Sequence, residues 1–468
     1  VAPRVDGGCV FRLTLPLAAA KVALTERARV LNTGNPHADS TDPVRRLTRR
    51  AGFWKAIGAS ATVLGWVTNG FEPRFLTTPP PTSFPNKGKL EPRHTRFIDE
   101  EIARRCASHE IELVGDADAP LPLADVHVIS PIFAVDKQSS PGKCRLIFDV
   151  RFVNAHLPVM PFRLPKLSEV AHVFNDSVLL FTTDLTDAYY HIGLAAGSER
   201  FFCFRWQGKI YRFRTICFGM SLSPFVFTKL VSEVVRFFRV LGLDLLAYID
   251  DFLFGTPADR LAAKDVVEFV LFVFAELGFS VSASKSSLEP ASTAQFLGFT
   301  VDIASGSVRA SAQKLATVGA AAWRLVDCSR AQKPVTPRKA ATVLGQLRAL
   351  RSAIGPIGIL TRYLSDWISV RCRYGWDKPH LLGAGAVDEL QFLLPKLATL
   401  NGMGLTGLQL PSRPTVRVRV DASDTGYGGF MLERCRRCGK THVETREFDA
   451  AERMTSSTHR ELLGAERS

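Results

Sequence analysis

The sequence predicts an α+β fold, and three observations indicate it. Two short apolar runs of strand type flank the acidic residues Asp250 and Asp251, so residues 245–255 are expected to form a β-hairpin with both acids at its tip. A second strand-like apolar run also ends at an acid, Asp184. Between the two runs, apolar residues recur at helical spacing from Ser223 to about Val240. Strands and helices mixed along one stretch of chain are typical of α+β proteins.

The acids at the expected hairpin tip indicate a metal site. Asp250 and Asp251 are adjacent carboxylates that repel each other, and magnesium binds through one or two carboxylates together with substrate phosphates. Two-metal phosphoryl transfer needs a further carboxylate from another element. A strand–helix–strand–strand order can bring Asp184 beside the pair on one sheet. For the pair considered alone, an ordinary surface turn is the alternative.

These segments resemble the catalytic motifs of a known family. The Tyr-Ile-Asp-Asp hairpin and the strand ending at Asp184 resemble the palm motifs of reverse transcriptases. Further resemblances follow in order: residues 218–224 to the loop that supports template and nucleotide, residues 277–285 to the next palm motif, and residues 296–299 to the primer grip. The resemblance covers about residues 125–305. It implies a right-hand polymerase with fingers, palm and thumb, followed by a partial ribonuclease H-like domain.

The resemblance also implies a reaction and a set of site residues. The reaction is attack of a primer 3′-hydroxyl on the α-phosphate of a deoxynucleotide, with two Mg²⁺ ions, or Mn²⁺ in their place, held by the catalytic residues Asp184, Asp250 and Asp251. The expected partners are an RNA template, a DNA primer, their duplex or hybrid, and deoxynucleoside triphosphates. Nucleotide binding is expected from Lys137, Arg145, Tyr189, Gly219 and Lys285, and the primer grip from Phe296, Leu297 and Gly298.

Two basic residues lie on opposite arms of a predicted hairpin in the fingers. Lys137 and Arg145 flank a Ser-Ser-Pro-Gly turn. Arginine can bind a triphosphate as a fork and lysine as a point charge. The alternative is a pair of solvated surface charges, but reverse transcriptases carry a lysine and an arginine at this place. Arg151 and Asn154 also match the pattern of that family.

Tyr189 is assigned a role in sugar selection from the resemblance. In reverse transcriptases an aromatic residue five positions after the first palm acid presses on the sugar and excludes a 2′-hydroxyl. The alternative is an ordinary core tyrosine, and since Tyr190 is adjacent, one of the two is expected to be core.

The chain is divided into four predicted regions. Residues 1–50 show little periodicity and are expected to be poorly ordered or to be the tail of an upstream region, whereas residues 51–71 suggest one or two short helices. A short amphipathic helix is expected over residues 100–112. The regions are an N-terminal extension with a Pro-rich linker at 1–95, fingers and palm at 96–305, a helical thumb and connection at 306–410, and the ribonuclease H-like part at 411–468.

The C-terminal region resembles the opening of a ribonuclease H domain. An alternating strand ends at Asp421, a second strand follows, and a helix with capping residues carries Glu461. The resemblance implies that Asp421 and Glu461 are the first two metal-binding carboxylates of an incomplete site, so no degradation of RNA is expected. Cys435 and Cys438 with His442 form half of a zinc pattern, and a loop with incidental cysteines is the alternative.

Composition favours an intracellular protein that binds nucleic acid. The chain has 468 residues and a formal net charge of +14, which favours polyanionic partners, although a soluble basic protein is the alternative. Its nine cysteines are scattered and odd in number, which favours a reducing compartment such as the cytoplasm or nucleus. No apolar run is long enough to span a bilayer and no secretory signal is visible. The sequence does not indicate an oligomeric state.

The detailed motifs favour one branch of the family. Phe218-Gly219 replaces the Gln-Gly of retroviral enzymes. Residues 221–229, 53–70 and 421–428 resemble DIRS-type retrotransposons, which use a tyrosine recombinase. A rival interpretation is an inactive element remnant that only binds nucleic acid. A polymerase that makes RNA is disfavoured by the bulk of Tyr189.

Overall fold

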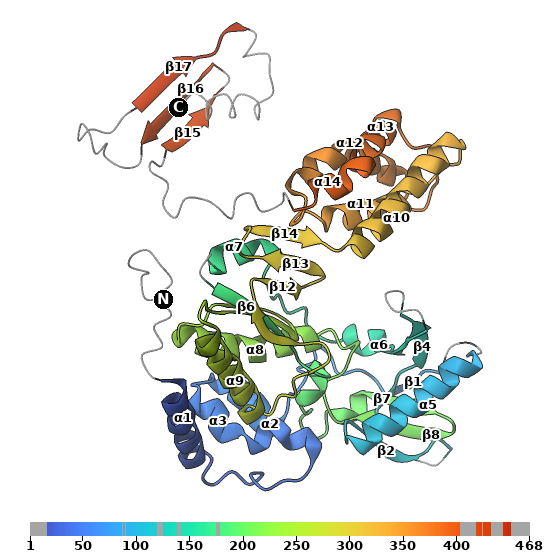
Figure 1. The fold of residues 1–468 in the computed structure, drawn as a ribbon. Coiled ribbons are helices and arrows are strands. Elements are labelled where there is room, and N and C mark those ends of the chain that lie inside the picture. The colour runs from blue at the N-terminus through green and yellow to red at the C-terminus, as the bar shows by residue number, and fades with distance from the viewer. Residues whose placement is uncertain are drawn as a thin grey trace. The chain divides into compact units, whose positions relative to one another are not determined.

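The computed structural model (Figure 1) describes most of the chain. The chain divides into two units, residues 9–406 and residues 407–468 together with 1–8, and each unit is described by itself. The described residues are 16–86, 88, 90–118, 125–137, 142–174, 178–402, 418–423, 425–431 and 443–450.

A four-stranded antiparallel sheet lies at the centre of the larger unit, in the order β11-β6-β10-β9. Its strands are β6 (Val178–Asp184), β9 (Leu245–Tyr248), β10 (Asp251–Pro257) and β11 (Ser287–Ala291). Two helices, α8 (Ser223–Val240) and α9 (Arg260–Glu276), cover one face of this sheet (Figure 1). Phe274 of α9 packs edge-on against Phe252 and Phe254 of β10, and Phe238 of α8 contacts Phe254. The strand–helix–strand–strand order predicted from the sequence is confirmed.

A second sheet and a separate hairpin lie beside the central sheet. The five-stranded sheet has the order β1-β3-β7-β8-β2. Its strands are β1 (Thr82–Ser83), β2 (Ile111–Asp116), β3 (Val128–Ile129), β7 (Cys203–Trp206) and β8 (Lys209–Phe213), and the hairpin is β4 (Ile132–Asp136) with β5 (Cys144–Phe148). The helix α5 (Pro92–Ala107) replaces the predicted helix at 100–112. It begins earlier because Pro92 stands in its first turn, and residues 111–116 are a strand.

The N-terminal helices belong to the same hydrophobic core as the central sheet. They are α1 (Leu17–Leu31), α2 (Arg46–Arg49), α3 (Ala51–Ala56) and α4 (Ala61–Asn69). Trp54 is fully buried and its Nε1 donates to the carbonyl of Leu277 at 3.1 Å. The predicted lack of order is therefore wrong for α1 and α2, while residues 1–15 lie outside the described part. A Cβ on Gly52 would lie 2.3 Å from the carbonyl oxygen of Ala28, so small residues let α1 and α3 approach closely.

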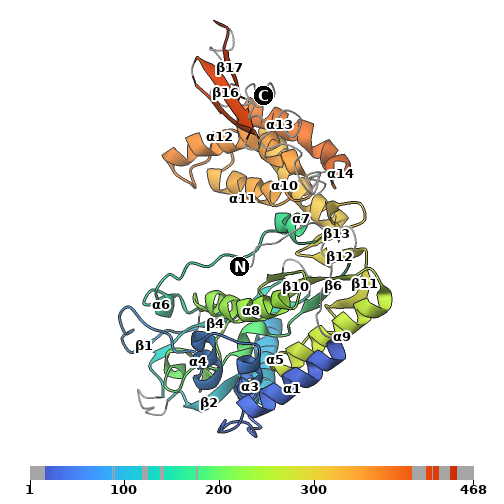
Figure 2. The same ribbon diagram turned by 90° about the vertical axis from the view of Figure 1, so that its left-hand side faces the viewer.

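A small sheet leads from the central sheet into a helical region (Figure 2). The sheet contains β12 (Thr293–Phe296), β13 (Phe299–Asp302) and β14 (Ser307–Ala310). The helices are α10 (Ala312–Arg330), α11 (Pro337–Arg348), α12 (Arg362–Arg371), α13 (Ala384–Leu393) and α14 (Leu397–Leu400), which agrees with the predicted helical character. The Asn401 side chain bonds both the N–H and the carbonyl of Ala310 and ties the end of this region to its start. Within the described ranges, no helix has the length and apolarity needed to cross a membrane.

The smaller unit contains a three-stranded antiparallel sheet. Its strands β15 (Val418–Ala422), β16 (Gly426–Met431) and β17 (Val443–Glu447) follow in chain order. Asp421 lies on β15 opposite Gly428, and Tyr427 packs on Phe448. The strand predicted to end at Asp421 is present, whereas Glu461, Cys435, Cys438 and His442 lie outside the described residues.

Candidate active site

The Tyr-Ile-Asp-Asp segment forms a tight hairpin between β9 and β10. Tyr248 pairs with Asp251, so Ile249 and Asp250 make a two-residue turn. Ile249 has a φ of +57°, a left-handed conformation that costs a β-branched residue on the order of 1–2 kcal/mol. The N–H of Leu185 donates to the carbonyl of Asp250 at 3.0 Å and helps to hold this turn. Strained backbone of this kind is concentrated at functional sites.

The central sheet brings the three predicted palm acids to one end. Asp184 of β6 pairs directly with Asp251 of β10, so the predicted placement of Asp184 beside the pair is confirmed. The N–H of Asp184 donates to Ser286 Oγ at 3.0 Å, and its carbonyl accepts from the N–H of Ser282 at 2.8 Å. These two bonds hold the backbone of Asp184 firmly. The residue is 9% exposed, so it is largely buried.

The three acids together carry more negative charge than their surroundings neutralise. Burial raises the pKa of Asp251 to about 6, and the neighbouring charges of Asp250 and Asp184 add to the shift. Burial is also the main reason why the pKa of Asp250 is raised. The one ion pair at the acids is with Lys285, whose Nζ lies 3.0 Å from Asp184 Oδ1, among the contacts of the described residues. That bond raises the pKa of Lys285. Three carboxylates beside one ammonium form a site that favours cations.

The donor set fits magnesium. All three side chains offer hard oxygen ligands, and Mg²⁺ is bound through one or two carboxylates together with substrate phosphates. The three carboxylates do not all converge within 4.8 Å in the part of the chain that the structure describes. Two ions about 3.5–4 Å apart would match a wider arrangement better than a single ion.

Replacing Asp251 by Asn is expected to stabilise the metal-free chain at pH 7.5. The folded-state pKa of about 6 lies above the ordinary value of 3.8, so ionisation destabilises the native state as the pH rises through about 4 to 6. Allowing for solvent screening, the gain on removing the charge is about 1 kcal/mol at pH 7.5 and near zero at pH 4. Thermal unfolding at both pH values, with chelator present, measures it. If the variant were no more stable than the parent at pH 7.5, burial and the neighbouring charges would not destabilise the ionised Asp251.

The two adjacent tyrosines have different surroundings. Tyr190 is 4% exposed, and the Arg105 guanidinium lies 3.8 Å from its ring centroid. Tyr189 is 7% exposed and packs against Phe218 and Phe227 at centroid distances of 4.7 and 5.8 Å. Burial raises the pKa of Tyr189 to about 12, and the charge of Asp250 adds to the effect. Both tyrosines are therefore buried in the core, and Tyr189 is the one whose pKa the charge of Asp250 raises.

A buried ionic network behind the site has no signal in the sequence. Arg105 binds Glu110 at 2.6 Å and Glu101 at 2.5 Å, and Arg104 binds Asp187 at 2.9 Å. Asp187 has a φ of +50° and starts the short 3₁₀ turn that carries both tyrosines. The network thus fixes the turn between Asp184 and Tyr189. The Arg104–Asp187 pair joins residues that are 83 positions apart in the chain, which is why the sequence did not reveal it.

The loop before α8 depends on Gly219. Gly219 has a φ of +100°, and a Cβ there would lie 2.5 Å from the carbonyl oxygen of Phe148. The Asn154 side chain donates to the carbonyl of Gly219 at 2.8 Å and accepts from the N–H of Ser221 at 2.9 Å. This gives Asn154 a physical task, namely to hold the loop in place. Arg151, in contrast, is exposed and paired with Asp149.

Gly219→Ala is expected to lower the free energy of unfolding by more than about 2 kcal/mol, because the new methyl group meets a backbone carbonyl and the φ is unfavourable. Gly197→Ala is the matched control, because Gly197 has a φ of +82° with open space around it and should lose only about 1 kcal/mol. Denaturant unfolding of both variants measures the difference. Equal losses would mean that the contact with Phe148 relaxes freely.

The two basic fingers residues lie on the same face of the β4–β5 hairpin. Arg145 pairs with Val135, and Lys137 follows Val135 by two positions, so their side chains point the same way. Arg145 is exposed. The arrangement suits binding of one anionic group by both residues, and their role stays a prediction.

The predicted primer grip is the turn between β12 and β13. Phe296 pairs with Phe299, so Leu297 and Gly298 form a two-residue turn with φ values of +52° and +75°. Positive φ at both positions is typical of a type I′ hairpin turn. Leucine at such a position is unusual and costs stability, which is consistent with a functional role that stays a prediction.

Comparisons with known proteins show what the central part of the chain is similar to. Residues 135–301 match the family described as reverse transcriptase (RNA-dependent DNA polymerase). Protein P of duck hepatitis B virus (strain China) is 28% identical over 183 residues, which are 37% of this chain and 23% of that protein. The retrovirus-related Pol polyprotein from transposon 412 of Drosophila melanogaster is 26% identical over 143 residues, 30% of this chain and 11% of that protein. The match spans less than a quarter of either relative.

Solved structures share the fold. The foamy viral protease-reverse transcriptase in complex with RNA/DNA hybrid has a TM-score of 0.55 at 16% identity, and the match covers 97% of this chain and 55% of that one. The same protein in complex with dsDNA gives a TM-score of 0.55 at 16% identity, with 97% and 85% coverage. The predicted α+β polymerase fold is thereby confirmed, whereas the ribonuclease H-like character of the smaller unit stays a prediction.

Proposed function

We propose that the reverse transcriptase domain of this chain is an active RNA-directed DNA polymerase, in which Asp184, Asp250 and Asp251 hold two Mg²⁺ ions. The reaction is attack of a primer 3′-hydroxyl on the α-phosphate of a deoxynucleoside triphosphate, with release of pyrophosphate. The observation that carries the proposal is the meeting of these three acids at one end of the β6–β10 pair, where burial and mutual repulsion raise the pKa of Asp251 to about 6. Bound magnesium would supply the charge that polarises the phosphate and aligns the two oxygens.

The other predicted site residues would bind and orient the nucleotide and the primer. Lys137 and Arg145 share a face of the hairpin and would bind the triphosphate, Arg145 as a fork and Lys137 as a point charge. Lys285 pairs with Asp184, and a metal ion on that carboxylate would compete with it. Lys285 would then be free to bind a phosphate oxygen. Tyr189 would press on the sugar and exclude a 2′-hydroxyl, while residues 296–298 would position the primer end.

The proposed partners are an RNA template and a DNA primer. The net charge of +14 favours a polyanionic partner, and the solved foamy viral relatives are in complex with RNA/DNA hybrid and with dsDNA. Residues 221–229 and 421–428 support an origin in a DIRS-type retrotransposon. The three antiparallel strands of the smaller unit, with Asp421 on the first, support a ribonuclease H-like part.

The test of the proposed function measures binding and synthesis in the same preparation. A labelled DNA primer annealed to an RNA template is titrated with the chain, and deoxynucleotides with Mg²⁺ are then added. We expect the wild-type chain to bind and extend, and Asp184→Asn to bind without extending. The second candidate function, a remnant that only binds nucleic acid, predicts equal binding and no extension by either protein.

We also expect that the chain leaves the RNA strand of a hybrid intact. The resemblance assigns two carboxylates here, Asp421 and Glu461, whereas two-metal hydrolysis needs ligands on both sides of the scissile phosphate. The measurement is cleavage of a labelled RNA strand in an RNA/DNA hybrid with Mg²⁺ or Mn²⁺. Cleavage that disappears in Asp421→Asn would contradict the expectation and show a working ribonuclease H site.

A further inference from the structure

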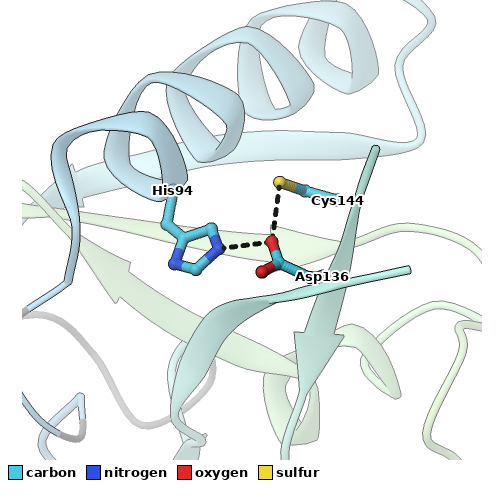
Figure 3. A group of neighbouring side chains, drawn as sticks. All are labelled: His94, Asp136 and Cys144. Atoms are coloured by element: carbon cyan, nitrogen blue, oxygen red, sulfur yellow. Dashed lines mark hydrogen bonds and ion pairs between the residues drawn. The ribbon is translucent and has the colours of Figure 1, made fainter. Parts of the chain in front are cut away.

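Three side chains with metal-binding groups meet at the base of the β4–β5 hairpin (Figure 3). His94 comes from the first turn of α5, Asp136 ends β4, and Cys144 begins β5. Asp136 and Cys144 are directly opposite each other in the strand pairing. The backbone therefore fixes two of the three positions, and α5 brings the third.

The spacing of the donor atoms suits one bound ion. Asp136 Oδ1 lies 3.0 Å from His94 Nε2 and 3.8 Å from Cys144 Sγ. All three donor atoms lie within 4.8 Å of one another. In a tetrahedral zinc site, metal distances of about 2.0–2.1 Å to N and O and about 2.3 Å to S place neighbouring donors roughly 3.3–3.6 Å apart. The two separations from Asp136 Oδ1, 3.0 and 3.8 Å, lie on either side of that range.

A neighbouring arginine occupies only the outer oxygen of the carboxylate. Arg93 pairs with Asp136 Oδ2 and, through its Nε, with Glu91 at 3.0 Å. Oδ1, the oxygen shared by His94 and Cys144, remains available. The hydrogen bond from His94 and then the Arg93 contact hold the pKa of Asp136 below its usual range. A hydrogen-bonded second oxygen is the usual condition of a ligating carboxylate.

We propose that His94, Asp136 and Cys144 form a Zn²⁺ site with an open fourth position, separate from the magnesium site at the palm acids. Sulfur and imidazole donors favour zinc over magnesium, which prefers oxygen alone. The charge balances, because Zn²⁺ offsets the Cys144 thiolate and the Asp136 carboxylate while Glu91 offsets Arg93. A cavity of about 670 Å³, bordered by Pro92, Gly142, Lys143 and Cys144, opens beside the cysteine ligand.

The site would fasten the hairpin to the helix. His94 belongs to α5 and the other two ligands to the hairpin, so one ion joins both elements. The opposite face of the same hairpin carries Lys137 and Arg145. Zinc would therefore limit the movement of the strands that bear these two residues.

Binding requires two proton adjustments at the ligands. Cys144 gives up its thiol proton to solvent, and His94 must place its proton on Nδ1 so that Nε2 can bind the ion. Zinc affinity should therefore fall as the pH is lowered and protons compete for both ligands.

The test uses Co²⁺ as a spectroscopic probe, with the full chain carrying Cys435→Ser and Cys438→Ser so that the Cys-X-X-Cys pair does not contribute. We expect one equivalent of Co²⁺ to give a thiolate charge-transfer band in the near ultraviolet, and Zn²⁺ to displace it and raise the melting temperature. Cys144→Ser and, separately, His94→Asn should each weaken Co²⁺ binding at least tenfold.

Cys106→Ser is the matched control. Cys106 is half-buried and free like Cys144, but it lies on α5, so the Cys106→Ser chain should keep the band. The proposal is overturned by any of three results: no band in the Cys435→Ser, Cys438→Ser chain, a band that persists in Cys144→Ser, or a band that Cys106→Ser removes.

Discussion

Asp250→Asn is expected to slow nucleotide addition at least about a thousandfold while changing the affinity for a primer–template hybrid by less than about threefold. Asp250 stands at the tip of the β9–β10 turn, where it would bind metal and would not touch the nucleic-acid backbone. Loss of one charge from a two-metal site removes several kcal/mol of transition-state stabilisation, and each 1.36 kcal/mol is about tenfold in rate. Rapid-quench incorporation of one deoxynucleotide measures the rate, and fluorescence anisotropy measures the affinity.

Asp265→Asn is the matched control for that experiment. Asp265 is an exposed residue of α9, so the same chemical change there should leave rate and affinity unaltered. If Asp250→Asn extended the primer at near the parent rate, the assignment of Asp250 as a metal ligand would be wrong.

Tyr189→Ala is expected to increase incorporation of ribonucleotides relative to deoxynucleotides by roughly ten- to a hundredfold, the range that a steric contact of about 1–3 kcal/mol supports. Tyr189 packs on Phe218 and Phe227 and lies near Asp250. Removing the ring opens space where the 2′-hydroxyl would fall. The measurement is kcat/KM for single incorporation of each sugar.

Tyr189→Phe separates the bulk of the ring from its hydroxyl. It keeps the ring and should keep the selectivity of the parent. An unchanged ratio in Tyr189→Ala would mean that Tyr189 serves only as core and that sugar selection lies elsewhere.

The palm was predictable from the sequence because its signals are local. The acids stand directly beside short, continuous apolar runs of strand type, and α8 shows apolar residues at helical spacing. Strands, helix and their order could therefore be assigned before any contact was known. Pairing of Asp184 with Asp251 then follows from the antiparallel order of the sheet. The left-handed conformation of Ile249 could not be predicted, because a β-branched residue disfavours it and only the surrounding structure enforces it.

The features that escaped prediction depend on distant contacts or on small side chains. The buried residues of α1 are Ala20 and Ala28, and the carbonyl of Ala28 lies against Gly52. Such small side chains give only a weak apolar pattern in the sequence. The contacts of Arg104 with Asp187 and of Arg105 with the Tyr190 ring join elements that lie far apart in the chain. His94 lies more than 40 residues before its two partners, so no motif spacing reveals the cluster at the hairpin base.

The most direct test of the proposed magnesium-dependent polymerase site is the rate of DNA synthesis by the wild-type chain as a function of Mg²⁺ concentration. A DNA primer on an RNA template is incubated with deoxynucleotides, first in chelator and then with Mg²⁺ restored over a range of concentrations. We expect no extension in chelator, a rate that rises with Mg²⁺ to saturation, and no recovery in Asp184→Asn. The proposed magnesium-dependent activity would be contradicted if the wild-type chain bound the hybrid but failed to extend the primer at any Mg²⁺ concentration. It would also be contradicted if the chain extended the primer equally well in chelator.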